Sequence, residues 1–207
     1  SLRRAMARTL SGRVRRIERF GLDEHPLRDV PFTVEQHRYR VRELAPASSH
    51  QPYARMLALP LESVEHQYER HANDPRSQHS ISLSHDAWGG LTHAVTIHCA
   101  RRTRADDTPP FDSEHEQTWW RDAHDEAQYS HYLNEVRSRA IHLTDRQGWR
   151  LGLPWQQRGN ALVLPAAQLP LRTISFEHFT SAESPLNDAA TRHLTGQSVQ
   201  RYQAPDT

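Results

Sequence analysis

The sequence predicts a mainly β protein of the α+β class, an antiparallel curved sheet or sandwich-like meander with two or three helices. Two runs, 79–83 and 91–99, alternate apolar and polar residues and bracket a loop that contains Gly89 and Gly90. Period-two alternation on both sides of a glycine-containing loop is typical of a β-hairpin. A third alternating run, 32–44, indicates a half-solvated strand. These three runs carry the β assignment.

Before the hairpin, the sequence alternates between extended runs and loops rich in proline. Residues 2–10 favour a short helix by propensity, and Ser11 with Gly12 is a plausible stop. Turn residues, including Asp74 and Pro75, mark the loops. The expected order is a strand 13–20, a loop 21–31, a strand 32–44, a loop 45–52, extended runs 54–59 and 61–70 with Pro60 between them, and a turn 71–76.

After the hairpin, residues 101–111 are polar and read as an exposed loop. Ser113 and Glu116 then have the S-x-x-E spacing of a capping box, and no glycine or proline follows as far as Val136. The sequence therefore predicts a helix from Ser113 to Val136. The remaining expectations are strands at 140–143, 160–164 and 171–176, a helix at 185–194 with Pro185 in its first turn, and a strand at 198–203.

The start of the predicted helix sets the domain boundary. Residues 1–112 form a β-rich hairpin domain with a short N-terminal helix, and residues 113–207 form a helix followed by short strands. The two parts are expected to pack together as one structural unit.

Charge and composition exclude several classes of partner. The chain has 207 residues, with 26 Lys+Arg (all arginine) against 25 Asp+Glu, so its net charge is only +1. Without a strong positive field, nucleic acid is not expected as a partner. No run approaches the roughly 20 apolar residues that span a bilayer, so direct membrane insertion is not expected. Cys99, the one cysteine, rules out an intrachain disulfide and is expected to be a buried thiol.

No constellation of residues indicates catalysis or a cofactor. The 15 histidines lack H-x-x-x-H and H-E-x-x-H spacing, and only His124 and His131 could share a face of the predicted helix. Two ligands do not fix a metal, so none is expected. Nucleophile elbows and phosphate-binding loops are missing, and the acidic clusters read as solvated faces. The sequence therefore predicts no catalytic, cofactor-binding or metal-binding residues.

Three tryptophans are candidate interface or binding residues. Trp88 lies in the hairpin loop, and Trp119 and Trp120 lie in the predicted helix. Aromatic faces pack in cores and interfaces and also stack on sugars. We expect packing, with carbohydrate binding as the alternative.

Several phrases together resemble a known family. They are SGRVRRIERFGLD at 11–23, PFTVEQHRYRVREL at 31–44, L-E-S at 61–63 followed by Y-E-R at 68–70 and D-P-R at 74–76, the basic pair at 101–102, and WRLGLP at 149–154. They resemble the middle-to-C-terminal region of the B component of ABC-type insecticidal toxin complexes (Tc toxins), which is related to the virulence protein SpvB. The likeness is strongest over residues 11–102. It departs from the family pattern at the helix from Ser113 to Val136 and at Glu24-His25-Pro26.

The resemblance implies a structural role. In this family the B and C components form a hollow shell of winding β-sheet around a toxic segment, and a β-propeller docks that shell on the pore-forming A component. We therefore expect a non-catalytic scaffold segment of a secreted toxin, whose export signal is outside this sequence and whose partners are the A and C components. The alternative is a secreted carbohydrate- or receptor-binding module. An isolated copy is expected to self-associate through the edge of the strand at 32–44 or at 91–100.

Overall fold

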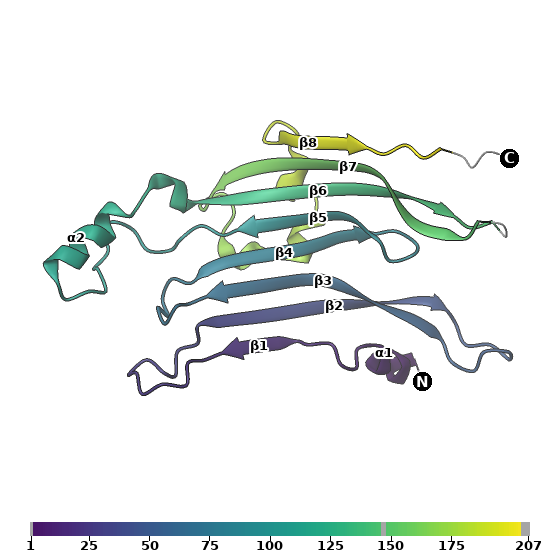
Figure 1. Cartoon of the computed structure of the whole chain (residues 1–207), viewed down its shortest axis with the longest axis horizontal. Helices are drawn as coiled ribbons and strands as arrows, with labels where there is room; N and C mark the ends of the chain where they lie inside the picture. Colours follow the sequence, from purple (N-terminus) through teal and green to yellow (C-terminus); the bar gives the residue numbers. More distant parts are fainter. Residues whose placement is uncertain (1, 146–147, 204–207) are drawn as a thin grey trace.

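The computed structural model describes residues 2–145 and 148–203 and shows one eight-stranded antiparallel sheet (Figure 1). Each strand pairs with its neighbours in sequence, so the order is β1 to β8 and the topology is a meander. The predicted mainly β antiparallel fold is thereby confirmed, as a single-sheet meander. The strands are β1 Arg16–Arg19, β2 Thr33–Ala45, β3 Arg55–Gln67, β4 Arg76–His85, β5 Leu91–His98, β6 Ser130–Leu143, β7 Arg150–Pro165 and β8 His193–Val199.

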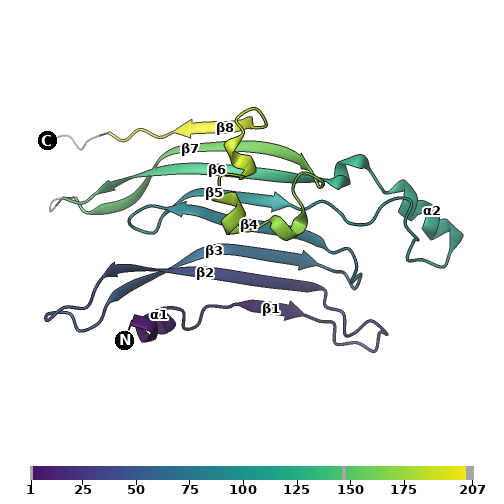
Figure 2. The same cartoon turned by 180° about the vertical axis from the view of Figure 1, so that it is seen from behind.

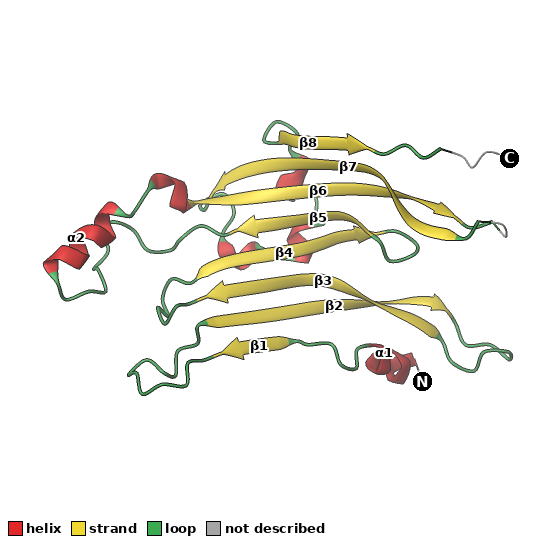
Figure 3. Cartoon of the chain, in the orientation of Figure 1, coloured by secondary structure: helices red, strands yellow, loops and turns green. Residues whose placement is uncertain are grey.

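Helices contribute little to the described residues (Figure 3). α1 and α2 lie at opposite ends of the sheet, and α3 crosses one of its faces. Their bounds are α1 Leu2–Thr9, α2 Glu114–Asp122 and α3 Phe176–Phe179, with 3-10 turns η1 Glu126–Tyr129, η2 Leu171–Thr173 and η3 Pro185–Asn187. The sheet continues from β5 directly to β6, so it crosses the boundary expected between residues 112 and 113.

The predicted hairpin is confirmed as β4 and β5. Ile81 pairs with Val95 and His79 with Ile97, and all four side chains are buried on one face. The two runs expected on either side of Pro60 form a single strand, β3. Pro60 is tolerated because β4 pairs with β3 only from Glu62 onward, so the backbone at Pro60 has β2 alone as a neighbour.

The helix expected from Ser113 to Val136 is mostly wrong. α2 ends at Asp122, and β6 begins at Ser130. Ser113 does stand at the N-cap, but its side chain makes no capping hydrogen bond. Residues 130–136 carry a period-two pattern in which His131 and Leu133 are buried, and pairing with both β5 and β7 overrides the helix-compatible composition.

Two predictions for the C-terminal part are also wrong. The strand expected at 171–176 is η2 followed by the start of α3, and the helix expected at 185–194 is η3 followed by the start of β8. The strand expected at 198–203 begins earlier, because β8 spans His193–Val199. Residues 166–192 cross a face of the sheet instead of pairing within it, and we call them the covering segment (Figure 2).

The hydrophobic core lies between the central strands and the covering segment. The segment contributes Leu169, Ile174, Phe179 and Leu186. They pack against the buried face of β4 to β7, formed by Ile81, Leu83, Val95, Ile97, Leu133, Leu162 and Leu164. The opposite face has small side chains at its centre, among them Ser80, Thr96 and Ala161, and larger ones in the next row, Glu65, Gln78, His98 and Tyr132. No described element covers its centre.

The free edges of the sheet match only in part those expected for self-association. Residues 91–98 form β5, which is paired on both sides, whereas β1 pairs with β2 only from Thr33 to Gln36, so residues 38–45 have β3 as their one strand partner among the described residues. The edge strands are β1, which has four residues, and β8, every residue of which is exposed. The expectation was wrong for residues 91–100, because a pattern of alternation reports faces, whereas an edge is set by the order of strands. Contact through the edge of residues 32–44 stays a prediction.

The alternation of covered and bare faces can be tested at neighbouring positions of β5. Ile97→Asp places an unpaired carboxylate in the core and is expected to lower the free energy of unfolding by about 4 kcal/mol. Thr96→Asp, on the bare face, is the matched control and should cost far less. Urea unfolding of both variants measures the difference, and equal losses would contradict the assignment of faces.

Candidate functional site

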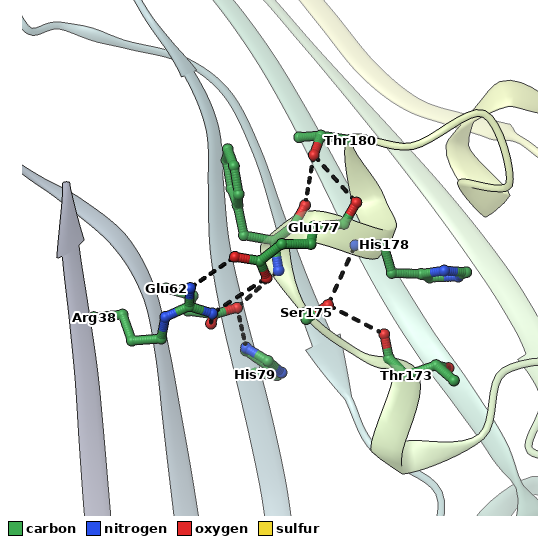
Figure 4. Close-up of polar contacts among 9 residues, drawn as sticks. Arg38, Glu62, His79, Thr173, Ser175, Glu177, His178 and Thr180 are labelled. Atoms are coloured by element: carbon green, nitrogen blue, oxygen red, sulfur yellow. Dashed lines mark hydrogen bonds and ion pairs between the residues drawn. The ribbon is translucent and has the colours of Figure 1, made fainter.

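A buried carboxylate, Glu62 of β3, lies where the sheet meets α3 (Figure 4). Arg38 of β2 is hydrogen-bonded to one of its oxygens. The other oxygen, Oε2, accepts from the backbone N–H of Phe176 at 2.9 Å and lies 3.1 Å from Nε2 of His79. Arg38 also donates to Glu177 of α3, at 2.7 and 3.2 Å. Glu62 and Arg38 therefore tie the covering segment to the first half of the sheet.

The ionisation of Glu62 follows from its partners. Burial acts to raise its pKa, but the hydrogen bonds from His79, Phe176 and Arg38 outweigh burial and lower the pKa below its usual value. The carboxylate is therefore ionised at neutral pH, with both oxygens engaged. A group in this state holds structure and is poorly suited to donate or accept a proton in catalysis.

A second buried carboxylate, Glu135 of β6, ties the other half of the sheet to the end of the covering segment. Its side chain has no exposed surface. Arg137 Nε and His93 Nε2 each lie 2.8 Å from Oε1, and Asn160 donates to Oε2 at 2.8 Å. Arg192, the last residue of the covering segment, forms an ion pair with Oε2 at 3.4 Å.

Glu135 is also held ionised. Burial acts to raise its pKa, and the hydrogen bonds from Arg137, Asn160 and His93 lower it further than burial raises it. The two carboxylates lie on either side of the hydrophobic core, each at a contact with the covering segment. We refer to Glu62 and Glu135 as the two anchoring carboxylates.

A third buried carboxylate, Asp74, explains two of the phrases noted in the sequence. It follows β3 in the D-P-R phrase and receives hydrogen bonds from Nε of Arg101 at 2.9 Å, the backbone N–H of Arg102 at 2.8 Å and the Thr103 hydroxyl at 2.6 Å. The D-P-R turn and the basic pair at 101–102 therefore contact each other in the fold.

Among the described residues, no group of three or more His, Cys, Asp or Glu side chains could hold a metal ion. The expectation that His124 and His131 share a helix face was wrong, because His131 lies in β6. His131 is buried, and its Nδ1 accepts from the backbone N–H of Ala100 at 3.0 Å. Cys99 is only partly buried, and its burial raises the thiol pKa to about 11, so the thiol stays protonated.

No Ser–His pair suited to nucleophilic catalysis forms in the covering segment. The Ser175 hydroxyl accepts from the backbone N–H of His178 and caps α3, whereas the His178 ring packs against Phe179. No helix of the described residues is long and apolar enough to cross a membrane.

The three tryptophans singled out from the sequence lie at two ends of the sheet. Trp88 is 46% exposed in the β4–β5 loop, with its ring 5.5 Å from that of Trp149 at an angle of 87°. Trp119 and Trp120 lie on α2 at the other end (Figure 1). Trp119 is 62% exposed, and Trp120 packs against His124. Their role as interface or binding residues stays a prediction.

Sequence reasoning missed the anchoring carboxylates. Glu62 was assigned no role, and Glu135 fell within the helix expected from Ser113 to Val136. The sequence did contain a signal for Glu135. It follows His131 and Leu133 at intervals of two residues, so it falls on the side of β6 that carries apolar residues.

Comparison with known proteins gives one family and several solved structures. A family model described as the insecticide toxin TcdB middle/C-terminal region matches residues 5–153. The crystal structure of TcdB2-TccC3 without its hypervariable C-terminal region matches 95% of this chain at 27% identity, with a TM-score of 0.84. The structure of the Photorhabdus luminescens Tc holotoxin pore matches 90% of this chain at 28% identity, with a TM-score of 0.79.

The chain spans only 9% and 8% of the matched chains in these two structures. No curated protein matches it.

Removing an anchoring carboxylate should destabilise the fold. Glu62→Ala leaves His79 and the Phe176 N–H buried without their acceptor and is expected to cost about 3 kcal/mol of unfolding free energy. Glu183→Ala, an exposed glutamate of the covering segment, is the control and should change stability by less than about 0.5 kcal/mol. Similar values for both variants in chemical denaturation would show that Glu62 does not anchor the segment.

The fold should lose stability on acidification. Burial lowers the pKa of His93, where Glu135 opposes it only in part, and that of His131. The unfolded chain therefore binds more protons than the folded one below about pH 6.5, and stability falls as the pH drops through that value. Glu62 and Glu135, with lowered pKa values, add a second loss as the pH falls below their usual value of 4.5.

Thermal unfolding at constant ionic strength measures this effect. The midpoint is expected to decline steadily between about pH 8 and about pH 4. A midpoint that rises on acidification would mean that these histidines and carboxylates are not buried as described.

Proposed function

Because the chain belongs to the family of TcdB insecticide-toxin middle/C-terminal regions, we propose that it is a non-catalytic segment of a Tc toxin shell. In this proposal it forms part of the wall of a B component and helps to enclose or present the toxic component. Its partners are the C component and, through the parent polypeptide, the A component, and the toxin to which it belongs is secreted.

The observation that carries the proposal is the single sheet with one covered and one bare face. A sheet of this kind is suited to form part of a shell wall. Its covered face packs against its own covering segment, and its other face is free to border an enclosed space. The buried carboxylates Glu62, Glu135 and Asp74 are all engaged in internal contacts, which favours structure over chemistry. The exposed edge strand β8 could continue into further sheet of the parent protein.

The alternative of a carbohydrate-binding module has weaker support. Sugars stack on exposed aromatic faces, and a shared platform needs rings that are nearly coplanar. The Trp88 and Trp149 rings stand at 87° to each other, and those of Trp120 and His124 at 61°. These pairs are typical of edge-to-face packing.

If the proposal is correct, destabilising this sheet should open the shell. The test uses the full-length polypeptide that contains this chain, co-expressed with its C component. Wild-type complex should shield the toxic segment from trypsin, whereas the double variant Glu62→Ala, Glu135→Ala should let the segment be cleaved faster.

Glu183→Ala is the matched control and should protect the toxic segment as the wild type does. A double variant that assembles normally and protects the segment fully would contradict a role in the wall. Failure of the wild-type polypeptide to associate with a C component would contradict membership of such a complex.

A further inference from the structure

We propose that the loop carrying Trp88 is an anchoring site for an extended segment of the parent polypeptide outside this chain. The inference rests on the proposed function, because it takes the parent to be a long toxin subunit. It names a contact that the sheet itself does not require, since Trp88 and its neighbour Trp149 are both exposed in the present structure.

A cavity of about 420 Å³ adjoins Trp88. It lies where the β4–β5 loop meets the end of the β6–β7 pair and the residues that follow β8. Its volume is in the range of ligand-binding clefts, and its wall is mixed apolar and polar, as such clefts usually are. Its lining includes Trp88, Leu91, Leu151, Trp155, Gln156 and Gln200.

The loop is held rigidly, although its tryptophan is exposed. Oδ1 of Asp86 accepts from the backbone N–H groups of Trp88 and Gly90, both at 2.8 Å. Arg42 of β2 donates to the carbonyls of Asp86 and Ala87, at 2.8 and 2.9 Å. These bonds fix both ends of the turn that presents Trp88.

A histidine of β6 adds a further restraint. Nδ1 of His142 accepts from the backbone N–H of Gly152 at 3.1 Å, so in the neutral ring Nε2 carries the proton and donates to Oδ2 of Asp86, also at 3.1 Å. Gly89 has a φ of +90°, and a Cβ there would lie 2.9 Å from Leu57. The loop is therefore restrained by its own Asp86 and by Arg42 and His142 of neighbouring strands.

Rigid presentation of an exposed aromatic residue is what an interface anchor requires. Tryptophan is enriched among the residues that dominate binding energy, and a side chain that is already ordered loses less entropy on binding. Exposed apolar side chains surround the anchor: Leu91 at 46%, Leu151 at 40% and Trp149 at 61%. A cluster of this kind marks a protein contact more often than free surface.

The polar lining favours an extended polypeptide. The side chains of Gln156, Gln157 and Gln200 both donate and accept, as the backbone of an unpaired strand does. Among the described residues, the lining holds one carboxylate, that of Asp86, which His142 engages, and one guanidinium, that of Arg139. The site therefore suits an uncharged or weakly acidic segment with an apolar side chain for the cavity.

The parent polypeptide is the favoured source of this segment. The matched toxin structures align with 90 to 95% of this chain, yet the chain spans only 8 or 9% of theirs, so most of such a polypeptide lies outside the present structure. Ser198 and Gln200 also line the cavity, so it adjoins β8, which is an edge strand of the sheet. A segment that contacts the exposed strand β8 would therefore lie close to the cavity.

Photo-cross-linking in the full-length polypeptide tests the inference. A photoreactive residue is introduced by Trp88→p-benzoylphenylalanine, and the control is Tyr53→p-benzoylphenylalanine in the exposed β2–β3 loop, which does not line the cavity. Irradiation should give a cross-link from position 88 to a peptide of the same polypeptide outside residues 1–207, with no change in the mass of the subunit. Position 53 should not yield that product.

Any other product from position 88 overturns the inference. These products are a cross-link to the C component, a cross-link to a second copy, a product confined to residues 1–207, or no product. The same samples report separately on the proposed function through association with the C component and protection of the toxic segment. A shell that assembles normally while position 88 stays unlinked would therefore remove this contact and leave the proposed function standing.

Discussion

The structure depends on covering one face of a single sheet. Eight strands in a meander bury little by themselves, and the main hydrophobic cluster forms where residues 166–192 cross β4 to β7. The covering segment has few regular elements, so its position is set by the contacts it makes. Glu62 and Glu135 supply the polar part of these contacts, and the desolvation of each carboxylate is offset because several donors surround it.

The sequence was informative where pairing and burial follow a period of two. The β4–β5 hairpin was predicted correctly because Ile81, Val95 and Ile97 alternate with polar residues on both strands. Residues 130–136 alternate as well, but the lack of glycine and proline was equally compatible with a helix. Pairing with β5 and β7, on either side of β6, favours the strand over the helix. A local sequence pattern does not show which strands will be neighbours.

The covering segment could not be predicted for a related reason. Residues 171–176 and 185–194 have apolar side chains at positions fixed by the sheet beneath them, with no period of their own. Glu62 was missed because a charged residue within a strand is normally exposed, and Glu135 was missed because its alternating run was assigned to a helix. The sequence was enough to select Trp88 as a candidate interface residue. It could not predict the hydrogen bonds of Asp86 that hold the loop of Trp88.

The contacts of the covering segment also connect parts of the chain that lie far apart in the sequence. Neighbouring strands contact each other locally, whereas Phe176 bonds to Glu62 across 114 residues and Glu177 to Arg38 across 139 residues. These ties join β2 and β3 to a segment that follows β7, so the covered face is complete only when both halves of the chain are in place. The covering segment lies late in the sequence and contacts the first long strands, so the sheet and its cover are joined by contacts between distant parts of the chain.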